Sequence, residues 1–279
     1  MNRTAQVITE QVKQGEFVPI YFEIGFDELN SKESVNIRLA DEFLMKLLGR
    51  VDRIDTCEKE DSVYVRIVDY KSSNKSMDLA SVYEGRQLQL LVYLNAAMEN
   101  EEKSGKQVVP AGVFYYQIDD PVIDTTSSMS DEEIERAITR ELRMTGLVNS
   151  DNDGQIVEMM DSDIDNESRV LNVSKTKSGL RASKQIISGD DFAVLTKYVK
   201  HKISDIGQSI LDGDIGIPVA DGMNRVSDPD CTYCKYRAVC CNGAGYTENT
   251  DVDAELSEDD TIHTNSNEEM LQLMRRKLS

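Results

Sequence analysis

The chain has 279 residues, 39% of them apolar, and a formal net charge of −20. This length and composition allow one substantial hydrophobic core with a smaller appended segment. The charge excludes a protein that wraps nucleic acid over its whole surface, but it leaves room for a local basic groove. No long apolar run and no signal peptide occur in the sequence. We therefore expect a soluble, cytoplasmic protein.

The first quarter of the chain predicts one polar helix followed by short strands. The helix spans 1–15 and begins abruptly, as a truncated element would. The strand-like runs that follow are 17–26, 34–40, 43–55 and 62–71. Short β-rich runs at this spacing indicate an antiparallel meander.

The hydrophobic period then becomes helical over 77–100, where Asp78 is a candidate N-cap. Residues 108–118 return to a strand pattern, and a strand–helix–strand succession implies a crossover onto the same sheet. A second amphipathic helix is predicted at 131–144, and a long helix at 190–213. The fold class is therefore α/β, a small mixed sheet flanked by helices.

Two acidic stretches interrupt this pattern. The first lies within a predicted loop-rich insertion at 119–188, most clearly loop-like from 145 onward. The second is the tail, 246–279, which we expect to lack fixed structure because it combines high charge with few large apolar residues. The predicted domain is 16–245, between the helix at 1–15 and this tail.

Charged residues stand at two predicted strand ends, in "GRVDRID" and "VRIVDYK". A hairpin between these strands would bring Asp52 and Asp69 together, and two carboxylates with a backbone carbonyl suit Mg²⁺. Lys71 shares a strand face with Asp69, where its ammonium could activate water or offset charge on a phosphate. The alternative is that these residues are ordinary solvated groups at strand ends, which is more common for such a triplet alone.

Together, "GRVDRID", "VDYKSS" 17 residues later and "QLLVYL" resemble the RecB-type branch of the PD-(D/E)XK nucleases. With "PIYFEIGF" and the cysteines described below, the chain resembles the C-terminal nuclease domain of the AddB family (RexB in related systems). The resemblance covers roughly 16–245 and implies a restriction-endonuclease-like core. It further implies that this chain is a fragment of a longer protein.

The resemblance assigns roles to individual residues. Asp52 and Asp69 match the metal-binding carboxylates, the Tyr70 carbonyl a further ligand, and Lys71 the catalytic lysine. A second set matches supporting positions, namely Gln89 and Tyr93 of the Q-x-x-x-Y motif and Glu23 as a supporting carboxylate. Without the family match, a polar contact, a core tyrosine and a strand ion pair explain this second set equally well.

Three arginines are candidates for contacts with DNA phosphates: Arg50, Arg53 and Arg86. Ion pairs with the many carboxylates of the chain are the alternative for each of them.

Four of the five cysteines crowd into "CTYCKYRAVCC", which predicts a metal site in a reducing compartment more readily than a disulfide framework. Free thiols in a turn are the alternative. Cys231, Cys234 and Cys240 form a pair plus a single, whereas zinc sites of four thiolates usually form two pairs. The resemblance implies a structural [4Fe–4S] cluster completed by a distant upstream cysteine. Only Cys57 precedes the group, so we expect the cluster to be incomplete or absent in this fragment.

The function that these features favour is a Mg²⁺-dependent DNA exonuclease domain of an AddAB-type helicase–nuclease. Such a domain acts with an AddA-like subunit in double-strand break repair and recombination. One alternative is a stand-alone CRISPR-associated exonuclease of the same branch. The other is a non-catalytic scaffold with a nuclease fold, which the presence of Asp52, Asp69 and Lys71 disfavours.

Overall fold

The computed structural model describes seven parts of the chain: 2–29, 33–39, 43–123, 129–177, 179–214, 235 and 266–279. Their contacts form a main unit, Met1–Asp212 with Ser266–Ser279. The second unit, Gly213–Asn265, falls almost entirely outside the described residues. Within the described part, no helix is long and apolar enough to cross a membrane.

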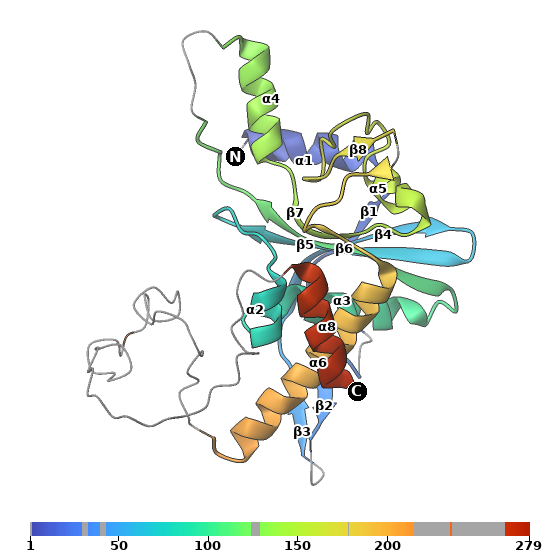
Figure 1. Ribbon diagram of the computed structural model, residues 1–279, viewed down its shortest axis with the longest axis vertical. Helices are drawn as coiled ribbons and strands as arrows, with labels where there is room; N and C mark the ends of the chain where they lie inside the picture. Colours follow the sequence, from blue (N-terminus) through green and yellow to red (C-terminus); the bar gives the residue numbers. More distant parts are fainter. Residues whose placement is uncertain are drawn as a thin grey trace. The chain divides into compact units, whose positions relative to one another are not determined.

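A six-stranded mixed sheet forms the centre of the main unit (Figure 1), with strand order β1-β4-β5-β6-β7-β10. Its strands are β1 (Val18–Gly25), β4 (Arg50–Lys59), β5 (Ser62–Lys71), β6 (Gln107–Gln117), β7 (Thr145–Asn149) and β10 (Ile186–Ile187). The β5–β6 and β7–β10 pairs are parallel, and the other neighbours are antiparallel. The predicted α/β class with a mixed sheet is confirmed.

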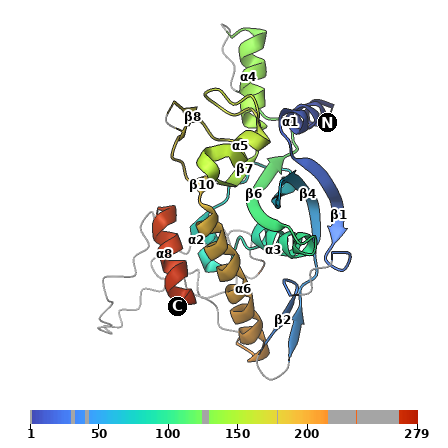
Figure 2. The same cartoon turned by 90° about the vertical axis from the view of Figure 1, so that its right-hand side faces the viewer.

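Helices cover both faces of this sheet (Figures 1 and 2). One face carries α1 (Asn2–Gln14), α4 (Asp131–Glu141) and α5 (Gln155–Met160), with the short 3₁₀ helix η2 (Asn152–Gly154) before α5. The other carries α2 (Leu79–Glu84), α3 (Gln89–Glu102), α6 (Gly189–Leu211) and α8 (Asn267–Leu278). β5 is therefore buried on both sides, which explains why its sequence reads as a nearly continuous apolar run.

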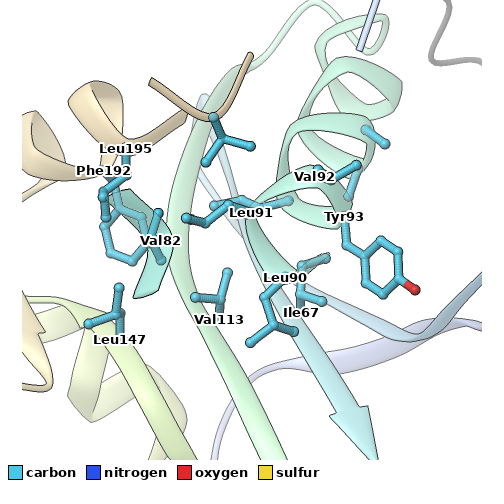
Figure 3. Close-up of a cluster of buried hydrophobic side chains, with 14 of the residues drawn as sticks. Ile67, Val82, Leu90, Leu91, Val92, Tyr93, Val113, Leu147, Phe192 and Leu195 are labelled. Atoms are coloured by element: carbon cyan, nitrogen blue, oxygen red, sulfur yellow. The ribbon is translucent and has the colours of Figure 1, made fainter. Parts of the chain in front are cut away.

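Each face of the sheet has its own hydrophobic core. The larger core joins the sheet to α2, α3, α6 and α8, and Figure 3 shows its centre around Ile67, Leu91, Val113 and Phe192. The smaller core lies beneath α5. Because side chains alternate along a strand, neighbouring residues of β4 and β5 contribute to different cores.

The segment predicted as one helix over 77–100 forms two helices. Asp78 caps α2 as predicted, accepting a hydrogen bond from the Ser81 amide at 2.9 Å. Gly85 then adopts a left-handed conformation (φ 94°) that ends α2. Glycine takes this conformation without the strain that a Cβ would add, so the chain turns before α3 begins at Gln89.

The meander prediction is correct for β1, β4 and β5 only. The strands at 34–40 and 43–55 were expected to follow one another in the same sheet. Instead β2 (Asn36–Arg38) and β3 (Leu44–Lys46) pair as a separate hairpin. Both strands are only three residues long, so they cannot cover a strand of the length of β4.

The prediction of a loop-rich insertion at 119–188 is wrong in part, because β7 and β10 belong to the main sheet. Only the small hairpin of β8 (Lys175–Thr176) and β9 (Gly179–Leu180) stands outside it. β7 and β10 have five and two residues, too short for their alternation to be recognised among acidic neighbours.

The prediction that the tail lacks fixed structure is wrong at its end, where residues 267–278 form α8. A capping box between Ser266 and Glu269 begins the helix. Met270, Leu271 and Met274 are buried in the larger core, and α8 packs against α6 and α2. The apolar residues are few but lie on one helix face, which an average over the acidic tail conceals.

We expect Met274→Ala to lower the free energy of unfolding by about 2–4 kcal/mol, because it leaves a cavity where a side chain of zero exposure lies. Gln272→Ala, on the exposed face of the same helix, is the matched control and should change stability by less than about 0.5 kcal/mol. Urea unfolding of both variants measures the difference. Equal stability of the two would show that α8 does not pack on the core in solution.

Candidate active site

A row of polar side chains crosses one face of the sheet. The β4–β5 ladder, extended by one step, places Asp52 opposite Asp69. Asp69 is paired with Tyr115 of β6, and Tyr115 with Thr145 of β7. Residues directly opposite one another point to the same face of a sheet. Four strands therefore contribute to one line of side chains, as the predicted β4–β5 hairpin requires.

The tight turn at Glu60–Asp61 sets this register, since it joins β4 and β5 through only two residues. The paired part of the ladder ends before Asp52 and Asp69. The amide of Tyr70 is consequently free of a backbone partner on that side, and it donates to Oδ2 of Asp52 at 2.8 Å. The N–H and C=O of one strand residue point the same way, so the Tyr70 carbonyl is directed towards β4 as well.

Asp69 is the buried member of the carboxylate pair, with an exposed fraction of 1%. Burial raises its pKa, and the negative charge of Asp52 acts in the same direction. The ammonium of Lys71 forms an ion pair with Oδ2 of Asp69 and opposes this rise, as does Lys75 more weakly. The carboxylate is held in a position where an additional cation would stabilise its charged form.

Lys71 and Lys75 both lie over the ring of Tyr115, with Nζ atoms 5.8 and 4.8 Å from its centroid. Burial, together with the nearby Asp69, raises the pKa of Tyr115 to about 12. Thr145 donates a hydrogen bond to the carbonyl of Lys75 at 2.6 Å and so holds the loop after β5 over the site. Sequence reasoning missed Lys75, Tyr115 and Thr145. Only the repeat of lysine four residues after Lys71 could have indicated the first.

Gln89 and Tyr93 lie on one face of α3, as predicted, and Nε2 of Gln89 donates to the Tyr93 hydroxyl at 2.7 Å. Figure 3 shows that hydroxyl pointing away from Leu90 and Leu91 of the larger core. Burial raises the pKa of Tyr93, and the charges of Asp69 and Asp52 raise it further. The pair therefore borders the two carboxylates from the helix above them.

The predicted arginines occupy three different environments. Arg50 is exposed and lies 3.8 Å from Glu23, itself exposed, so neither side chain is committed to the core. Arg86 forms an ion pair with Glu84 at 2.8 Å. The expectation that Arg53 contacts a phosphate is wrong, because Arg53 is 3% exposed and points into the opposite side of the sheet.

Arg53 instead belongs to a buried ion cluster beneath the site. Its Nε and Nη2 atoms donate to the two oxygens of Asp55, both at 2.8 Å, and Arg66 donates to Asp55 at 2.7 Å. Arg53 also donates to the hydroxyl of Tyr70 at 3.0 Å. These bonds link adjacent strands on the face away from the carboxylates, and they hold Tyr70, which follows Asp69.

The donor set of this site fits a hard cation. Among the described residues, no three His, Cys, Asp or Glu side chains gather as a metal centre, so Glu23 does not join the two aspartates. Asp52, Asp69 and the Tyr70 carbonyl supply oxygen donors only, which suit Mg²⁺. The raised pKa of Asp69 is the observation that favours a cation at this place. Cys231, Cys234 and Cys240 lie outside the described residues.

Comparison with known proteins agrees with this geometry. The family model described as the PD-(D/E)XK nuclease superfamily matches residues 1–241. The chain belongs to the PD-(D/E)XK nuclease superfamily. The restriction-endonuclease-like core implied by the motifs is confirmed with it.

Within this superfamily, curated relatives are named as the AddB-type subunit of an ATP-dependent helicase/deoxyribonuclease. The relative from Thermoanaerobacter sp. (strain X514) is 36% identical over 86% of this chain and 20% of its own length. The relative from Clostridioides difficile (strain 630) is 36% identical over 96% of this chain and 23% of its own length. The chain thus spans about a fifth of these proteins. The resemblance to the AddB family is confirmed.

We expect Asp69→Asn to stabilise the protein at neutral pH in the absence of divalent cations. Burial raises the pKa of Asp69 in the folded state, so its ionisation disfavours folding as the pH rises through that pKa. The amide removes this loss, and the melting temperature should rise by a few degrees. Below the ordinary Asp pKa of about 3.9 the two proteins should melt alike.

Asp61→Asn, at the exposed turn of the same hairpin, is the matched control. It removes one negative charge without changing a buried group, so its melting temperature should follow the wild type at every pH. A stabilisation by Asp69→Asn that does not vary with pH would contradict the electrostatic explanation.

Proposed function

We propose that this chain hydrolyses phosphodiester bonds of DNA in a reaction that depends on Mg²⁺. The observation that carries the proposal is the pairing of Asp52 and Asp69 across β4 and β5, with the Lys71 ammonium bonded to Asp69. Phosphodiester hydrolysis needs carboxylates for a cation and a positive group near the scissile phosphate. Membership of a nuclease superfamily supports the same reaction.

Asp52, Asp69 and the Tyr70 carbonyl would hold the cation. When bound, Mg²⁺ supplies a Lewis acid and lowers the pKa of water, so that hydroxide is available near neutral pH. Asp52 is oriented for this role by the Tyr70 amide. Asp69 is oriented by Lys71 and shielded from bulk water by its burial.

Lys71 is the candidate for positioning the attacking water and for offsetting charge on the phosphate. Its side chain is 27% exposed, so the ammonium remains open to substrate on one side while it contacts Asp69 on the other. Lys75 provides a second cation near the same tyrosine ring. As the family resemblance implies, hydrolysis leaves a 5′-phosphate and a 3′-hydroxyl.

The Gln89–Tyr93 pair supports this site from α3. The bond between them fixes the hydroxyl of Tyr93 near Asp52 and Asp69, where it can donate to an oxygen of the substrate or to water. We infer that its role is positioning, since its pKa lies above the ordinary tyrosine value and the group stays protonated.

The wider context follows from the relatives. We propose that the domain works within a helicase–nuclease, beside an AddA-like subunit, and serves double-strand break repair and recombination. The support is that the matched relatives are subunits of an ATP-dependent helicase/deoxyribonuclease. Exonuclease activity belongs to this proposal, as does a structural [4Fe–4S] cluster at Cys231, Cys234 and Cys240 of the longer protein.

The test compares DNA degradation by wild type, Asp52→Ala, Asp69→Ala and Lys71→Ala with Mg²⁺ and with EDTA. We expect each variant to lower the rate at least about 100-fold, since each removes a group that stabilises charge in the reaction. EDTA should abolish the activity and excess Mg²⁺ should restore it.

Asp61→Ala is the control, because it removes a carboxylate from the exposed end of the same hairpin. Circular dichroism establishes that each variant is folded. Wild-type rates in folded Asp69→Ala protein would overturn the catalytic assignment. Full activity in EDTA would overturn the metal dependence.

A further inference from the structure

A basic groove lies on the face of the sheet opposite the carboxylates. It runs between α1, α4 and the segment 167–185 as two adjoining cavities of about 450 and 520 Å³. Both cavities are lined by Arg140, Arg143 and Glu167, so they are continuous along one path. We call this path the arginine groove.

The charge of the arginine groove is opposite to that of the chain. Three acidic side chains line it, against six basic ones: Arg136, Arg140, Arg143, Arg169, Arg181 and Lys184. The difference between six and three leaves +3 in a protein of net charge −20. Such a local concentration of arginine attracts anions, and guanidinium matches phosphate oxygens in pairs.

Arg143 is fixed before any ligand arrives. Its side chain is 11% exposed, Nε donates to the carbonyl of Arg140 at 3.1 Å, and Nη1 donates to the carbonyl of Ser168 at 3.3 Å. A guanidinium that is already ordered loses little conformational freedom on binding an anion.

Glu167 indicates where an anion is received. One of its oxygens lies 3.5 Å from Arg140 and 3.6 Å from Arg143, too far for close hydrogen bonds. The Glu167 side chain is 57% exposed, so it can turn away into solvent. The two arginines therefore share a carboxylate that a phosphate can replace.

The arginine groove begins at the end of the sheet that carries the candidate active site. Arg143 stands two residues before Thr145, and Thr145 belongs to the row that includes Asp69. Neighbouring strands are about 5 Å apart, so two strand steps separate Thr145 from Asp69 by about 10 Å. A strand that leaves the carboxylates around this end of the sheet reaches the groove within a few nucleotides.

We propose that the arginine groove binds consecutive phosphates of a single DNA strand that extends from the site of hydrolysis. The two cavities joined end to end suit several phosphates in a row, and arginine suits their oxygens. This inference rests on the proposed function for the choice of DNA, whereas the groove itself rests on its own residues.

The test measures binding of a fluorescent single-stranded oligonucleotide in EDTA, where no cutting occurs. We expect Arg136→Gln/Arg140→Gln to weaken binding about 3- to 10-fold. The plot of log affinity against log salt should flatten by about 1.4, because each lost contact with single-stranded DNA contributes about 0.7. Glu167→Gln should tighten binding, since it removes the competing carboxylate. Arg276→Gln/Lys277→Gln, on the exposed surface of α8, removes the same charge and should leave affinity unchanged.

Asp69→Ala separates this inference from the proposed function, because it should bind the oligonucleotide yet fail to cut it. Wild-type affinity and salt dependence in the groove variant, with cutting intact, would overturn the inference alone. So would an equal loss in the groove variant and the α8 control. A groove variant that loses inorganic phosphate but keeps the oligonucleotide would also overturn it, in favour of a site for free phosphate.

Discussion

The register between β4 and β5 is the constraint on which the rest of the site depends. Side chains alternate between the faces of a strand, so a slip of one residue would exchange the two faces. Asp52 would then point into the smaller core and Arg53 would replace it above the sheet. The two-residue turn at Glu60–Asp61 and the different chemistry of the two faces prevent this slip.

The two faces support the site in different ways. Beneath it, Asp55 joins Arg53 and Arg66 without exposure to solvent, and these charges are acceptable there only because they are paired. Above it, α3 covers Asp69 and excludes water. Burial of a carboxylate opposes stability, and the folded chain keeps Asp69 in place through the packing of its neighbours. Sites that prepare for a cation or a transition state commonly carry such an opposition.

Charge is distributed unevenly over the protein, and this distribution bears on how an acidic chain could handle DNA. Lys71 and Lys75 stand beside the carboxylates, and the arginine groove lies on the other face at the same end of the sheet. Both positive regions are local, so they can receive phosphates while the net charge of −20 repels nucleic acid elsewhere. This arrangement favours contact with one strand along a limited path.

The sequence by itself determined the α/β class, the superfamily and the pairing of Asp52 with Asp69, because strand periodicity and motif order are local properties. Only the tertiary structure decided which face each arginine takes, as Arg53 shows by turning to Asp55. It also decided the place of Lys75, of β7 and of α8. A short strand or a helix with three buried apolar residues is stable only against its neighbours, and no local pattern records those neighbours.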